Sequence, residues 1–68
     1  MTLRDALCLA LEAVTLPPSR RAVERALNAA GWPYVDETDV ELADVPGGVR
    51  VTLWHGLASE SRVVARAP

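Results

Sequence analysis

The hydrophobic residues near the start of the chain repeat at helical spacing. The apolar positions of this stripe are Leu3, Leu7, Ala10, Leu11 and Val14. They fall on one face of a helix with 3.6 residues per turn. Thr2 with Asp5 three positions later resembles a capping box, and Pro17 and Pro18 end the helix because proline lacks an amide hydrogen. We therefore expect a helix over residues 2–15.

A second helix is indicated over residues 19–30. Its apolar stripe consists of Val23, Ala26, Leu27 and Ala30. Ser19 is a favoured N-cap residue, and Gly31 lies where a left-handed residue commonly ends a helix. The short linker between the two segments predicts a packed pair of antiparallel helices.

After Trp32-Pro33 the pattern changes from helical to alternating. Apolar and polar positions alternate over residues 39–45, 49–55 and 61–66, as in strands with one buried face. Two helices followed by three strands predict an α+β fold with two layers. In this fold an N-terminal αα-hairpin packs on a three-stranded antiparallel sheet, in the order ααβββ. Nothing in the sequence divides residues 1–68 into more than one domain.

The register of the first two strands follows from their apolar positions. Pairing Leu42 with Leu53 places the apolar residues of both strands on one side of the sheet. A loop over residues 46–49 gives this register and keeps Pro46, which has no N–H to donate, out of the ladder. We expect this loop and this pairing.

The composition favours association with another chain. A chain of 68 residues buries only about 60% of the surface that it exposes when unfolded. Small domains often compensate with disulfides, a metal or oligomerisation. One cysteine excludes an internal disulfide, and we find no Cys/His cluster for a metal. We therefore expect a homo-oligomer.

The sequence contains no recognisable catalytic set. Nucleophilic catalysis needs a thiol or hydroxyl beside an oriented base, but Cys8 lies among leucines and His55 ends a predicted strand. We expect no enzymatic activity, no cofactor and no metal. Residues 1–16 carry charges that do not fit a signal peptide, so we expect a cytoplasmic protein with no membrane partner.

The side of the sheet that faces away from the helices is the first candidate site. In the third strand we expect Val63 and Ala65 to face inward. The outward residues, which form the candidate interface, are then Trp54, Arg50, Thr52, Val64, Arg62 and Arg66. An exposed Trp beside Arg and Val has the composition of an interface core. The same face would also suit a stacking platform for single-stranded nucleic acid.

The second candidate site is the polar face of the second helix. Arg21, Arg25 and Asn28 line one helical face, and Arg and Asn are common readers of base edges. A helix pair followed by a Gly-tipped hairpin resembles part of a winged helix-turn-helix domain, which implies DNA binding through this helix. The chain departs from that pattern because it lacks a preceding helix and has no Lys or Arg at the hairpin tip.

The favoured hypothesis is a non-enzymatic interaction or assembly module that acts as a homodimer. A small nucleic-acid-binding regulator is the alternative, and a different protein as the partner is the third. The net charge of −2 gives no support to a polyanion partner.

Overall fold

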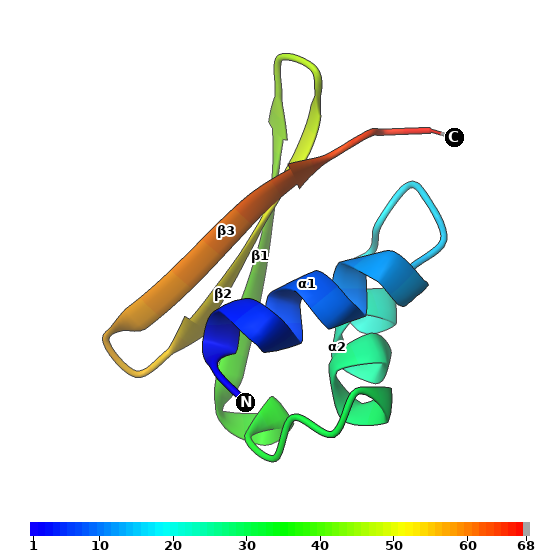
Figure 1. The fold of residues 1–68 in the computed structure, drawn as a ribbon. Helices are drawn as coiled ribbons and strands as arrows, with labels where there is room; N and C mark the ends of the chain where they lie inside the picture. The colour runs from blue at the N-terminus through cyan, green and yellow to red at the C-terminus, as the bar shows by residue number, and fades with distance from the viewer. Residues whose placement is uncertain (68) are drawn as a thin grey trace.

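The computed structural model describes residues 1–67 and shows two helices followed by a three-stranded antiparallel sheet (Figure 1). The elements in chain order are α1 (Leu3–Ala13), α2 (Arg20–Ala29), the 3-10 helix η1 (Val35–Glu37), β1 (Thr38–Val45), β2 (Gly48–His55) and β3 (Ala58–Val64). Both helices pack on one face of the sheet, α1 mainly over β3 and α2 over β1. The predicted ααβββ order and α+β class are confirmed.

The N-terminal caps of both helices are the residues that the sequence predicts. The Thr2 hydroxyl accepts a hydrogen bond from the Asp5 N–H at 3.1 Å, and the Asp5 carboxylate accepts one from the Thr2 N–H at 3.2 Å. These two bonds form a complete capping box. The Ser19 hydroxyl accepts from the Ala22 N–H at 3.2 Å. The helices end at Ala13 and Ala29, one or two residues before the predicted ends.

The C-terminus of α2 is closed by a Schellman motif. Gly31 adopts a φ of 87°, which carries little strain only in glycine. The Gly31 N–H donates to the Asn28 carbonyl at 3.1 Å, and the Trp32 N–H donates to the Leu27 carbonyl at 3.0 Å. This pair of bonds defines the motif, and it brings Trp32 into the core, where the side chain is only 6% exposed.

The sheet order is β1-β2-β3, and the predicted register of β1 and β2 is wrong by two residues. Val40, and not Leu42, lies opposite Leu53. The loop contains only Pro46 and Gly47, because Gly47 takes the positive φ of 91° that the second central position of a type II turn requires. A shift of two residues keeps every side chain on its predicted face.

The predicted orientation of the third strand is also wrong. The turn before β3 contains only Gly56 and Leu57, so the strand begins at Ala58 and not at residue 61. As a result Val64 lies opposite Val49 and packs against the core, whereas Val63 lies opposite Arg50 and points outward. Ala65 lies beyond the end of β3.

The core lies between the helices and the inner face of the sheet. Its buried residues are Ala6, Leu7, Ala10, Val23, Leu27, Trp32, Val40, Val49, Val51 and Leu53. Gly48 marks a close approach at the end of this layer, because a Cβ atom there would collide with the backbone carbonyl of Val64. The end of β3 therefore lies against the start of β2 in a way that only glycine permits.

Candidate functional site: the outer sheet face and the α2 hollow

The face of the sheet opposite the helices has no covering element within residues 1–67 (Figure 1). We call it the outer sheet face. Its residues, taken strand by strand from the observed register, are Asp39, Glu41, Ala43, Val45, Arg50, Thr52, Trp54, Ser59, Ser61 and Val63. Since sheets normally bury one face and hydrate the other, the apolar members of this face are the ones that need an explanation.

Two large apolar side chains stand on the outer sheet face. Trp54 is 38% exposed and Val63 is 50% exposed. They do not cover each other, because Trp54 lies opposite Ser59 and Val63 lies opposite Arg50. Ser59, which marks the position of Trp54 on β3, and Val63 are four residues apart along the strand, which is roughly 13 Å at the rise of a strand. Each side chain therefore exposes its own apolar surface.

Half of the predicted interface residues share this face. Arg50, Thr52 and Trp54 lie on β2 with their side chains on the outer side, as expected. Arg62 lies opposite Val51 on the helix side of the sheet, and Val64 packs inward. The inverted orientation of β3 causes this difference.

Arg66 is also absent from the outer sheet face. Its guanidinium donates to the Gly48 carbonyl at 3.0 Å and lies 3.4 Å from the Asp44 carboxylate. These contacts tie the chain after β3 back to the β1–β2 turn. Arg66 thus has a local structural role at the end of the sheet.

The charges around Trp54 do not suit a nucleic-acid platform. Asp39 lies directly opposite Trp54, and Glu41 lies opposite Thr52. Arg50 is the one arginine that the observed register places on this face. A stacking platform needs cations near the aromatic ring for the phosphates, whereas here the two residues directly opposite Trp54 are Asp39 and the uncharged Ser59.

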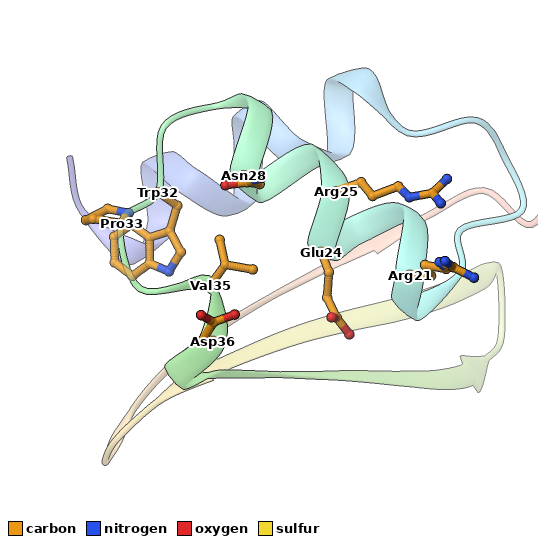
Figure 2. Close-up of a pocket in the computed structure, with 8 residues that line it drawn as sticks. All are labelled: Arg21, Glu24, Arg25, Asn28, Trp32, Pro33, Val35 and Asp36. Atoms are coloured by element: carbon orange, nitrogen blue, oxygen red, sulfur yellow. The ribbon is translucent and has the colours of Figure 1, made fainter.

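The second candidate site is a hollow along α2. Arg21, Arg25 and Asn28 all line it, so the structure brings these predicted residues together (Figure 2). The hollow has a volume of about 520 Å³ and is also lined by Glu24, Trp32, Pro33, Val35 and Asp36. Its two acidic side chains, Glu24 and Asp36, reduce the positive potential that would attract phosphate.

An aromatic cluster lies at the end of the sheet where β1 begins and β2 ends. His55 stacks on Tyr34 with ring centroids 4.7 Å apart, and Trp32 meets both rings edge-on. The Trp32 indole Nε1–H donates to the Thr38 hydroxyl at 2.9 Å, and that hydroxyl donates to the Tyr34 carbonyl at 2.7 Å. The sequence places Trp32 and Tyr34 together, but only the end of β2 brings His55 to them.

This cluster offers little for catalysis. The His55 Nε2 lies 3.7 Å from a Glu37 carboxylate oxygen, which is too far for a hydrogen bond. The Thr38 hydroxyl is buried and already makes two hydrogen bonds. Cys8 lines a different groove, between α1 and β3, to which His55 does not contribute. The rings of Trp32, Tyr34 and His55 pack together and cover the end of the core.

Neither α1 nor α2 is long and apolar enough to cross a bilayer. Comparisons with protein-family models, with curated proteins and with solved structures find no match to this chain. The function is therefore inferred from the geometry of the chain's own surfaces.

Proposed function

We propose that the chain is a non-enzymatic protein-interaction module that self-associates through the outer sheet face and the sheet edge beside it. The observation that carries this proposal is the uncovered outer sheet face, on which Trp54 and Val63 are 38% and 50% exposed. Trp is among the residues that contribute most binding energy at interfaces. A single free cysteine is consistent with a cytoplasmic location.

The size of the chain supports the same proposal. A single core in a domain of this length supplies a small stability margin. Both faces of the sheet carry apolar side chains, yet the two helices pack on one of them. Burial of the other face against a second copy would add apolar contact at about 25 cal/mol per Å². A different protein that presents a similar surface is the alternative occupant.

The role of Trp54 is tested by substitution. Trp54→Ala should raise the dissociation constant of the dimer at least tenfold while the far-UV circular dichroism of the fold is retained, because interface Trp truncations commonly cost about 2 kcal/mol or more. Leu9→Ala is the matched control, because Leu9 is 46% exposed on α1. Sedimentation equilibrium of both variants measures the effect. Equal dissociation constants for the two variants and the parent would contradict the assignment of the interface to this face.

A nucleic-acid-binding function remains the second candidate, because the α2 hollow gathers Arg21, Arg25 and Asn28. Affinity for nucleic acid would fall steeply as salt rises, since bound counterions are released. An Arg21→Ala/Arg25→Ala variant would then lose binding to a fluorescent oligonucleotide and keep the parental molar mass. If the parent protein shows no binding to the oligonucleotide at low salt, this candidate is rejected.

A further inference from the structure

The edge of the sheet formed by β3 is unpaired within residues 1–67. β3 has β2 as its neighbour on one side, and its seven residues run from Ala58 to Val64 in continuous register without a bulge. It contains no Pro, which would block pairing, and its two charged residues, Glu60 and Arg62, are of opposite sign, so that a suitable register can pair them. Such an edge presents a row of backbone N–H and C=O groups to a further strand.

From the residues along this edge, we infer that the second copy pairs with β3 through its own β3, antiparallel and centred on Ser61. This inference rests on the proposed self-association and specifies its geometry. Direct opposition of the two Ser61 residues places Glu60 of each copy opposite Arg62 of the other. Opposite charges at directly facing strand positions stabilise a pair, and like charges destabilise it.

The charged residues at this edge are available for a partner. Glu60 and Arg62 lie on the helix side of β3, where they border the groove with α1. The ion pairs within residues 1–67 are Arg20–Glu24 and Arg66–Asp44, and His55 with Glu37 counts as a further pair only when the imidazole is protonated. Neither Glu60 nor Arg62 takes part in these pairs. In the proposed dimer Glu60 of each copy lies opposite Arg62 of the other copy.

The same register also brings the exposed apolar residues together. Ser59 of one copy would lie opposite Val63 of the other, and Ser59 already lies opposite Trp54 on β2. One cross-strand row would then contain Trp54, Ser59 and the second copy's Val63. Two strand spacings total roughly 10 Å, so the large indole can lean over the small Ser59 toward Val63. In a single chain the two apolar side chains lie in different rows.

The opposite edge of the sheet argues against the competing arrangements. β1 carries Asp39, Glu41 and Asp44 and no basic residue, so a β1–β1 pair would set acidic strands against each other. Pairing of β1 with β3 of another copy would be heterologous, so it would build a ring of several copies or an open filament and not a closed dimer. The two-fold β3 pair is complete with two copies. The free edges of the dimer's sheet are then the two acidic β1 strands.

The register is tested by a cysteine at the proposed two-fold axis. Directly opposed residues in an antiparallel pair have Cα atoms about 4.5–5.5 Å apart, within the range that a disulfide spans. In a Cys8→Ala background, Ser61→Cys should form a covalent dimer with oxidised glutathione. Ser59→Cys is the matched control, since it lies on the same strand and face, and its two copies would be roughly 13 Å apart or more. We expect cross-linking at least tenfold slower for Ser59→Cys.

Charge reversal provides a second test that needs no cysteine. Glu60→Arg or Arg62→Glu alone places like charges opposite each other twice in the dimer. Each single variant should raise the dissociation constant about tenfold, which corresponds to about 1.4 kcal/mol. The double variant Glu60→Arg/Arg62→Glu recreates two opposite-charge pairs and should return to within about threefold of the parent.

The outcomes separate the register from the proposed function. Preferential cross-linking of Ser61→Cys together with rescue by the double reversal supports the inference. Equal cross-linking at the two positions, or no rescue in a parent protein that is dimeric by light scattering, would overturn the β3 pairing and leave self-association standing. A parent protein that is monomeric by light scattering would overturn both.

Discussion

At the scale of single residues, Thr38 links the aromatic cluster to the sheet. Its hydroxyl accepts from the Trp32 indole and donates to the Tyr34 carbonyl, and the residue is 8% exposed. A buried indole N–H without a partner costs more than the hydrogen bond itself contributes, because the group has lost its water. The small polar side chain at position 38 is therefore what allows Trp32 to be buried in the core.

Thr38→Val tests this role. Valine keeps the shape and the strand propensity but leaves the Trp32 indole without an acceptor, so the free energy of unfolding should fall by about 1–3 kcal/mol. Urea denaturation at a fixed protein concentration measures the change. Thr15→Val is the control, because Thr15 is exposed in the helix linker, and a change within about 0.5 kcal/mol is expected there. Equal losses in the two variants would show that the Thr38 hydroxyl contributes nothing specific.

At the scale of elements, the helices could be predicted from the sequence and the strand pairing only in part. Thr2, Ser19 and Gly31 are local signals, and each acts in the structure as expected. Turn length depends on the backbone conformations of Pro46, Gly47 and Gly48, and the alternation of apolar and polar residues does not reveal these. Pro46 fits the first central position of a two-residue turn, where no ladder N–H is needed.

The orientation of β3 was harder to predict for a related reason. Ser59 and Ser61 on one face and Glu60 and Arg62 on the other are all polar, so the pattern does not specify which face is buried. The adjacent pair Val63-Val64 fits either choice equally. Strands with two polar faces specify register weakly. The part of the candidate site on β2 was therefore predictable, and the part on β3 was not.

The capping box at the start of α1 predicts a dependence of stability on pH. The Thr2 N–H donates to the Asp5 carboxylate, and this lowers the pKa of Asp5 below its ordinary value. A lowered folded-state pKa means that the stabilisation is complete above the unfolded-state pKa of about 3.9 and is lost as the pH falls through the folded-state value. Asp5→Asn lacks this titration. Its melting temperature should therefore fall less between pH 7 and pH 3 than that of the parent.

Thermal unfolding followed by circular dichroism at both pH values measures this difference. Glu12→Gln removes a carboxylate from the same helix without touching the capping box. This variant should keep the pH-dependent stabilisation from ionised Asp5. Its melting temperature should therefore fall further between pH 7 and pH 3 than that of Asp5→Asn. A fall in Asp5→Asn as large as the fall in the parent would show that the box does not contribute through ionised Asp5.

At the scale of the whole molecule, the arrangement of layers is the basis of the proposed self-association. The helices occupy one face of a three-stranded sheet, which leaves an apolar-bearing face and an unpaired β3 edge on the other sides. The acids of β1 and the opposite charges of β3 make the two edges chemically different. The proposed self-association through β3 would explain the exposure of Trp54, the exposure of Val63 and the pattern of charges by a single interface.

The most direct measurement is the molar mass of the parent protein by light scattering, at low and at high salt, after removal of nucleic acid. The chain has a mass of 7.3 kDa, and we predict twice that mass at both salt concentrations, because apolar contact does not weaken as salt rises. A mass of one chain across the accessible concentration range would contradict self-association. If such a monomer also arrived with bound nucleic acid, the Arg21 and Arg25 face would become the functional surface instead.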